Sequence, residues 1–169
     1  MRSRYQALMV TVLLFLPGLS CAADTVITLT GTIKASPCTV DSATKPVNLG
    51  EYYVDKIKAS GDYIPFSLSL SSCPTGTSTV TATFSGTPDT TSPVWYYANA
   101  GTAKNIHIEL ATDATTPAGL GNGKSMNASV NGTSKAVEFK MKARVNKDDS
   151  LTPAPGTILA TVNVAFTYS

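Results

Sequence analysis

Apolar and polar residues alternate along most of the chain, which is the pattern of strands with one buried face. No stretch shows a competing helical period. Clusters of Gly, Pro, Asn, Asp and Ser separate the alternating runs and predict turns between them. The sequence therefore predicts an all-β domain, an antiparallel sandwich of the immunoglobulin type. The clearest runs cover residues 64–70, 80–84, 106–110, 137–145 and 158–168.

A further alternating run, residues 25–35 (TVITLTGTIKA), precedes Cys38. Such a run is by default a strand of the domain's own sheet. Gly31 in its middle is typical of a place where another backbone approaches closely. Only two residues separate the run from Cys38, which leaves little room to fold back onto a sheet that contains this cysteine. The apolar face of the run consists of Ile27, Leu29, Gly31, Ile33 and Ala35.

The last alternating run, residues 158–168, ends one residue before the last residue of the sequence, Ser169. The body of the chain contains about six strands, one fewer than a seven-stranded immunoglobulin-type sandwich. An apolar strand with an open edge is a template for pairing with another chain. The two ends together predict that the sheet of the domain lacks one strand. They also predict that residues 25–35 form a strand that does not belong to this sheet.

The first residues have the features of a secretory signal peptide. Arg2 and Arg4 are basic, residues 7–16 are apolar, and residues 17–22 are mostly small. We predict a signal at 1–22, an N-terminal extension at 23–37 and a domain at 38–169. The apolar part is too short for a stable membrane anchor. A lipoprotein signal, with Cys21 as the first mature residue, is less favoured because Gly18 replaces the expected leucine.

Removal of the signal leaves 147 residues, the size of one domain. They carry 11 basic and 11 acidic residues and no basic cluster, which argues against nucleic acid or an anionic membrane as partner. Two cysteines remain, Cys38 and Cys73, and in an exported protein they are expected to form one disulfide. A two-cysteine metal site would need more ligands, and His107 is the only histidine.

Enzymatic chemistry is not indicated, and neither a cofactor nor a metal is expected. A nucleophile–base arrangement would have to use His107. This histidine lies between Ile106 and Ile108, so we expect it on the outer, solvated face of a strand. The carboxylates show no paired spacing and are expected to be surface charges; examples are Glu51, Asp55, Glu109 and Glu138.

The alternating tail with Gly31, the cysteine pair and the C-terminal run together resemble subunits of chaperone–usher pili (fimbriae) of Gram-negative bacteria. Terminal strands of that family carry a glycine fourteen residues from the end and a penultimate aromatic residue, which match Gly156 and Tyr168. The resemblance covers nearly all of the chain after the signal. The stretches CPTGTSTVTATFSG, GTAKNIHIEL and FTYS are most similar to the minor tip adaptor subunits of type 1 pili.

This resemblance implies an incomplete immunoglobulin-like β-sandwich that lacks its seventh strand and has a hydrophobic groove in its place. A donor strand from another protein completes the fold, first from a periplasmic chaperone and then, at the outer-membrane usher, from the tail of a neighbouring subunit. The implied donor positions are Ile27, Leu29, Gly31, Ile33 and Ala35. The implied acceptor-groove and chaperone-recognition positions are Gly156, Ile158, Ala160, Val162, Val164, Phe166 and Tyr168.

The expected function is that of a structural subunit of an adhesive pilus, exported through the periplasm to the cell surface to support cell adhesion. The favoured position is a minor tip adaptor between the adhesin and the fibre. The alternatives are a major rod-forming pilin and, less favoured, a secreted lectin-like or adhesin module. Adhesins of the family carry two domains and no free donor tail, whereas this chain has one domain and a tail. No small-molecule substrate is expected.

Overall fold

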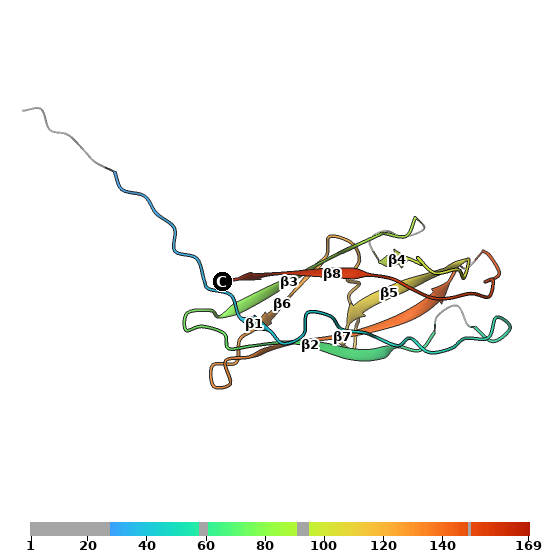
Figure 1. Cartoon of the computed structure of the whole chain (residues 1–169), viewed down its shortest axis with the longest axis horizontal. Helices are drawn as coiled ribbons and strands as arrows, with labels where there is room; N and C mark the ends of the chain where they lie inside the picture. Colours follow the sequence, from blue (N-terminus) through green and yellow to red (C-terminus); the bar gives the residue numbers. More distant parts are fainter. Residues whose placement is uncertain (1–27, 58–60, 91–94, 149) are drawn as a thin grey trace, which may run out of the picture. The chain divides into compact units, whose positions relative to one another are not determined.

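The computed structural model describes residues 28–57, 61–90, 95–148 and 150–169 (Figure 1). The predicted signal at 1–22 and the donor position Ile27 lie outside these residues. The chain divides into two units, Met1–Thr32 and Ile33–Ser169. In the first unit, residues 28–32 contain no strand. The second unit holds eight strands and, over the part described, no helix, so the predicted all-β class is confirmed.

Five antiparallel strands form the larger sheet, in the order β1-β2-β7-β5-β4. The long central strand β7 pairs with β2 on one side and β5 on the other. Its apolar residues alternate with Glu138, Lys140, Lys142 and Arg144, as the sequence predicts. The strands are β1 (Thr39–Val40), β2 (Ile64–Ser71), β4 (Tyr96–Ala98), β5 (Ile106–Thr112) and β7 (Val137–Lys147).

Three antiparallel strands form the smaller sheet, in the order β6-β3-β8. They are β3 (Thr79–Gly86), β6 (Ser125–Ser129) and β8 (Val162–Tyr168). The C-terminal strand, predicted over residues 158–168, is shorter than expected because residues 158–161 are not in a strand. A turn at Asn131 joins β6 of this sheet to β7 of the other one.

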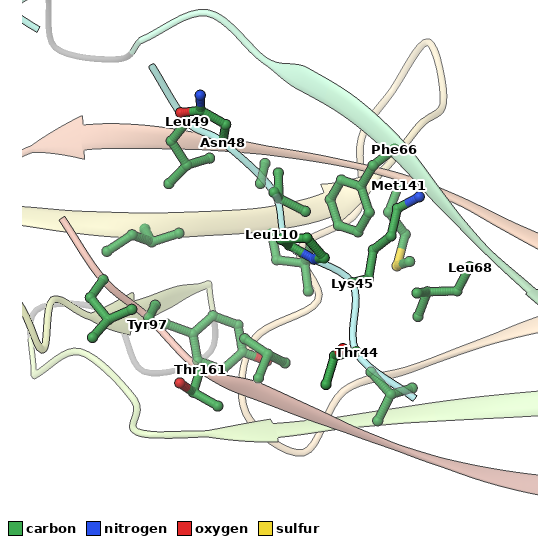
Figure 2. A pocket seen from close by; sticks show the side chains of 18 of the residues that line it. Thr44, Lys45, Asn48, Leu49, Phe66, Leu68, Tyr97, Leu110, Met141 and Thr161 are labelled. Carbon is green, nitrogen blue, oxygen red and sulfur yellow. The ribbon is translucent and has the colours of Figure 1, made fainter. Parts of the chain in front are cut away.

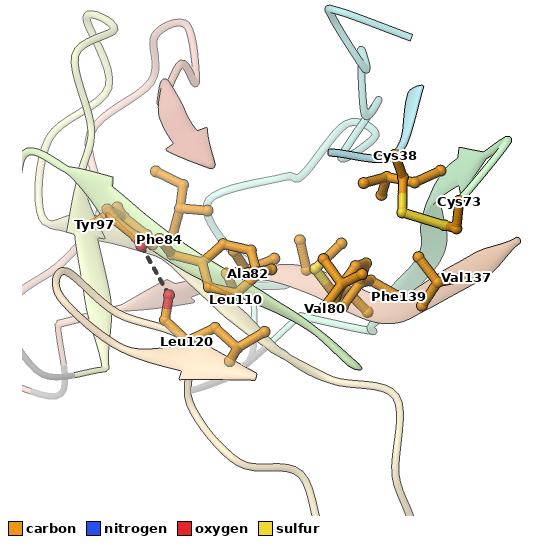
Figure 3. Packing of buried hydrophobic residues seen from close by; sticks show 14 residues of the cluster. Cys38, Cys73, Val80, Ala82, Phe84, Tyr97, Leu110, Leu120, Val137 and Phe139 are labelled. Atoms are coloured by element: carbon orange, nitrogen blue, oxygen red, sulfur yellow. Dashed lines mark hydrogen bonds between the residues drawn. A yellow bond between two sulfur atoms is a disulfide. The ribbon is translucent and has the colours of Figure 1, made fainter. Parts of the chain in front are cut away.

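The core lies between the two sheets (Figure 3). From the smaller sheet, the inward residues Val80, Ala82 and Phe84 have no exposed surface. From the larger sheet, Phe139 is equally buried. The period of two in the sequence places these side chains on the inner faces. The cluster also includes the disulfide between Cys38 and Cys73, which confirms the predicted pairing and joins the residue before β1 to the loop after β2.

Candidate functional site

A groove of about 1670 Å³ opens between strand β2 of the larger sheet and the C-terminal segment that ends in β8 of the smaller sheet. Phe66 and Leu68 lie on the β2 side and Thr161 on the C-terminal side (Figure 2). The segment of residues 41–53, which follows β1, lines a further part of the groove. The two sheets are thus separated where β2 and β8 face each other.

The wall formed by β8 is an open sheet edge. β8 pairs with β3 over its whole length, from Val80↔Tyr168 to Gly86↔Val162. Within the described part of the chain, no strand pairs with its other edge. Val162, Val164 and Phe166 alternate with exposed residues, are half-buried and line the groove. Their backbone can therefore accept a further strand while their side chains contact it.

The segment before β8 is held by a loop instead of a strand partner. Ala103 N donates to Thr157 O at 3.1 Å, and Ala100 N donates to Leu159 O at 2.8 Å. Leu159 N in turn donates to Asn99 Oδ1 at 2.8 Å. These contacts take up the backbone groups that a sheet ladder would use, which is why the strand begins only at Val162.

Gly156 lies where this segment crosses the loop. A Cβ atom at this position would be 2.5 Å from Thr102 C and 2.6 Å from Thr102 Oγ1, and it would also collide with Ala103 N. Only glycine permits so close an approach. Of the seven predicted acceptor positions, the groove lining contains Gly156, Ile158, Ala160, Val162, Val164 and Phe166. Tyr168 is outside the lining and packs against the core cluster.

The opposite wall was not predicted from the sequence. β1 pairs with β2 through only two residues, Thr39↔Ser71 and Val40↔Leu70. Beyond a hydrogen bond from Asp41 N to Ser69 O at 3.2 Å, the chain leaves the β2 edge, so residues 64–68 of that edge have no backbone partner in the described structure. The alternation of Phe66 and Leu68 was visible in the sequence. That these residues face β8 depends on the sheet order, which the sequence does not show.

The floor of the groove is part of the main core. Tyr97, Ile108, Leu110 and Met141 line the groove and are between 1% and 7% exposed. Tyr97 donates a hydrogen bond from its hydroxyl to Leu120 O at 2.7 Å. Burial raises the pKa of Tyr97 to about 12, so this hydroxyl stays protonated at neutral pH.

The chemistry of the groove suits an apolar chain segment. Its charged residues are Asp41, Lys45 and Glu51, all exposed and all in the segment of residues 41–53. Among the residues with described positions, no group of His, Cys, Asp and Glu could hold a metal ion. In the same part of the chain there is no helix long and apolar enough to cross a membrane. An apolar groove with an open edge on each wall can bind an extended strand by backbone and side-chain contacts.

The predicted donor positions from 28 onward are in no strand. Leu29 is 90% exposed and Ile33 is fully exposed, although both are large apolar residues. Gly31 is exposed, and a Cβ atom there would meet nothing within 4 Å. Ala35 is half-buried. The apolar face of this run is therefore available for contact.

Two predictions about the outer face of the larger sheet were wrong. His107 was expected in solvent, but it is 5% exposed and stacks on Tyr96, with ring centroids 3.9 Å apart. Glu109 was expected to be a surface charge, but it is also 5% exposed. Aromatic side chains from neighbouring segments cover this face, and one of them, Tyr63, donates a hydrogen bond to Glu109 Oε1 at 2.7 Å.

Glu109 is the centre of a hydrogen-bonded cluster. Its Oε2 accepts hydrogen bonds from Arg144 Nε and Asn146 Nδ2, both at 2.8 Å. Burial alone would raise the pKa of Glu109, but the bonds from Asn146, Tyr63 and Arg144 and the charge of Arg144 outweigh it and lower the pKa. Burial and the bond to Glu109 raise the pKa of Tyr63 to about 12. The cluster lies away from the groove and its bonds join β5, β7 and Tyr63, so it stabilises the sheet, although Asn146 Oδ1 is buried without a hydrogen-bond partner among the described residues.

Known proteins resemble both the sequence and the fold. A family profile described as "Fimbrial protein" matches residues 27–169. Protein FimG of Escherichia coli (strain K12) is 36% identical over 151 residues, which cover 88% of this chain and 87% of FimG. The S-fimbrial adhesin protein SfaS of Escherichia coli O6:K15:H31 (strain 536 / UPEC) has the same identity and coverage. The crystal structure of the P pilus rod subunit PapA is similar with a TM-score of 0.64 at 18% identity, covering 79% of this chain and 100% of that chain.

Proposed function

Because the chain belongs to the fimbrial protein family, we propose that it assembles into its pilus by accepting a strand in the groove and donating residues 27–35 to another subunit. Members of this family are structural subunits of pili on the cell surface, and this chain is one of them. The observation that carries the proposed mechanism is the open groove between β8 and residues 64–68 of β2, whose facing edges have no strand partner in the described part of the chain.

On the acceptor side, the incoming strand pairs with the free edge of β8 and covers the core floor. Alternate side chains of an extended strand point to the same face, so one row enters the groove while the other stays in solvent. Val162, Val164 and Phe166 already present this spacing along β8. Filling the groove removes the open edge of β8, which is otherwise a template for aggregation.

On the donor side, the tail offers the matching row of side chains. Leu29 and Ile33 are exposed almost completely, so each would gain roughly 1.5–3 kcal/mol on burial. Gly31 lies between them and is the donor position where a backbone can approach most closely. The tail is short before Cys38, and this favours donation to another subunit over insertion into its own domain.

The partners of this proposal are a periplasmic chaperone, an outer-membrane usher and the neighbouring pilus subunits, including an adhesin. We assign the chain to the position of a minor tip adaptor. The stretches that resemble tip adaptors and the similarity to FimG support this position. Purified fibres separate it from a rod subunit, because a rod subunit would be the most abundant protein in the fibre and an adaptor a minor one.

A second candidate function is that of an adhesin, because the relative SfaS carries that name. Binding by the purified chain and by cells that lack it distinguishes the two functions. If the chain is an adaptor, it binds neither host cells nor sugars, and cells without it lose adhesion because the adhesin is no longer joined to the fibre. If the chain is an adhesin, it binds them alone.

The groove predicts how the subunit behaves in the periplasm. Produced alone, the chain exposes the apolar groove, so we expect degradation or aggregation. Produced with its cognate chaperone, it should give a soluble one-to-one complex. A stable, cooperatively unfolding monomer without any partner would contradict the open-groove mechanism.

Donor and acceptor roles can be tested separately in the same chain. Gly31→Leu should block donation only, and its control Thr30→Leu changes the opposite face of the tail. Val164→Arg should block acceptance only, and its control Ala165→Arg changes an exposed residue outside the groove lining. Mixed together, the two defective chains should form a dimer in which Val164→Arg donates and Gly31→Leu accepts. Normal fibres from either defective chain alone would contradict the assignment.

A further inference from the structure

Two Asn-Gly pairs lie in exposed turns of the domain, and the structure holds them differently. Asn131-Gly132 is in the turn between β6 and β7, and Asn122-Gly123 is in the turn that precedes β6. Asparagine before glycine is the sequence in which the side-chain amide is least shielded from the next backbone nitrogen, because glycine has no side chain. We propose that Asn131 is a site of spontaneous deamidation and that the fold protects Asn122 from the same reaction.

The reaction needs only water. Gly132 N attacks Asn131 Cγ and forms a C–N bond, while its proton passes to water. The bond between Cγ and the side-chain nitrogen then breaks, and ammonia leaves with a proton. The cyclic imide that results is opened by water at either carbonyl, which gives aspartate or isoaspartate. No atom changes its oxidation state.

The attacking nitrogen is free in one pair and bound in the other. In the described structure, Gly132 N donates no hydrogen bond, and the space around Gly132 is open. Gly123 N donates to Phe84 O at 2.8 Å, and Phe84 N donates to Lys124 O at the same distance. Because Phe84 is completely buried, attack by Gly123 N requires local opening of the end of β3.

The attacked carbonyl is also more polarised at Asn131. Its Oδ1 accepts hydrogen bonds from Thr133 N and Ser134 N, both at 2.9 Å. These donors stabilise the negative charge that develops on the oxygen when the nitrogen attacks. Oδ1 of Asn122 accepts one hydrogen bond, from Gly86 N at 3.2 Å. Both differences favour reaction at Asn131.

The modification would change a turn near the disulfide. Lys135 N donates to Asn131 O at 2.9 Å, and Cys73 N donates to Lys135 O at 2.8 Å. Aspartate adds a negative charge to this exposed turn, and isoaspartate also lengthens its backbone. Deamidation would therefore mark older subunits at one end of the domain. The proposal is independent of strand exchange.

Tryptic peptides can report the two sites separately. Cleavage after Lys104, Lys124 and Lys135 gives peptide 105–124 with Asn122 and peptide 125–135 with Asn131. The secreted chain, isolated in its folded assembly, is incubated at neutral and at mildly alkaline pH and digested. Mass spectrometry measures the replacement of NH₂ by OH, and an isoaspartate methyltransferase assay measures the isomer. Asn127, which precedes alanine, is an internal reference in the second peptide.

We expect Asn131 to react roughly tenfold faster than Asn122 in the folded chain. Attack at Asn122 first requires the bond from Gly123 N to Phe84 O to open, and one net hydrogen bond changes such an opening equilibrium by about this factor. In denaturant both pairs should react at similar rates. Gly132→Ala should slow the reaction at Asn131 and leave Asn122 unchanged. Equal rates in the folded chain, faster reaction at Asn122, or an Asn131 that reacts only in denaturant would each overturn the proposal.

Discussion

Truncation of Leu29 tests whether the tail fills the groove of another molecule or of its own domain. The test uses a chain in which a copy of residues 25–37 follows Ser169 through a flexible linker, so that the copy can occupy the groove. Leu29→Ala is then made either in the copy or in the native tail. Thr30→Ala at the same two places is the matched control, because Thr30 lies on the opposite face of the run.

The expected effect follows from exposure and side-chain size. Leu29 is 90% exposed before donation, so nearly its whole side chain can gain from burial. Leucine to alanine removes about three methylene equivalents at roughly 0.8 kcal/mol each, which is about 2 kcal/mol. Core truncations of leucine cost roughly 2–5 kcal/mol, and the groove is open on one side, so we expect about 2–3 kcal/mol.

Guanidinium unfolding followed by circular dichroism measures the change as a shift of the midpoint at constant slope. Leu29→Ala in the copy should lower the free energy of unfolding by this amount. Thr30→Ala in the copy should change it by less than about 0.5 kcal/mol. Leu29→Ala in the native tail should have no effect. A loss of stability from the native-tail variant would show that the tail folds back onto its own domain and would refute the reasoning.

Three further predictions concern the stability of the same fused chain. Gly156→Ala should destabilise it by about 1–3 kcal/mol through collision with the crossing loop, whereas Gly132→Ala, in open space, should be close to neutral by the same unfolding assay. Glu109→Gln, which removes the ion pair with Arg144, should lower the free energy of unfolding by about 2–3 kcal/mol. Lys140→Gln, which removes the exposed ion pair with Glu138, should lower it by about 0.5 kcal/mol or less. Because the pKa of Glu109 is lowered in the fold, its stabilisation is present at neutral pH and lost as pH falls through that pKa, so Glu109→Gln should flatten the acid side of the stability profile. Tyr97→Phe removes a buried hydrogen bond and should cost about 1 kcal/mol, and absorbance titration should lose a tyrosine that ionises near a pKa of about 12.

The sequence predicted the strands well because alternation records the face on which each residue lies. Val80, Ala82 and Phe84 were expected inward and are fully buried. Alternation does not record what covers the outer face. His107 and Glu109 were therefore expected in solvent, although other residues of the same domain cover them.

Part of the candidate site could be placed from the sequence. Of the seven positions that the resemblance implied for the acceptor, six line the groove: Val162, Val164 and Phe166 share one face of β8, and Gly156, Ile158 and Ala160 lie in the segment before it. The start of β8 at Val162 and the opposite wall at Phe66 and Leu68 depend on contacts between distant parts of the chain. Loop 99–103 binds the backbone of Thr157 and Leu159, and nothing in the local sequence indicates this. Sheet order is equally long-range.

The position of the groove links binding to folding. Tyr97 and Met141 belong both to the groove floor and to the buried core, each with 1% of its surface exposed. Phe166 of β8 packs on Phe139 of the larger sheet with ring centroids 5.7 Å apart, so the groove wall and the core share contacts. A strand that enters the groove therefore extends the core of the domain. Since a ligand that binds only the folded state stabilises it by its binding free energy, the free energy that holds two subunits together would also keep the acceptor folded. Dissociation of a subunit and unfolding of its acceptor should then respond in parallel to any substitution in the groove.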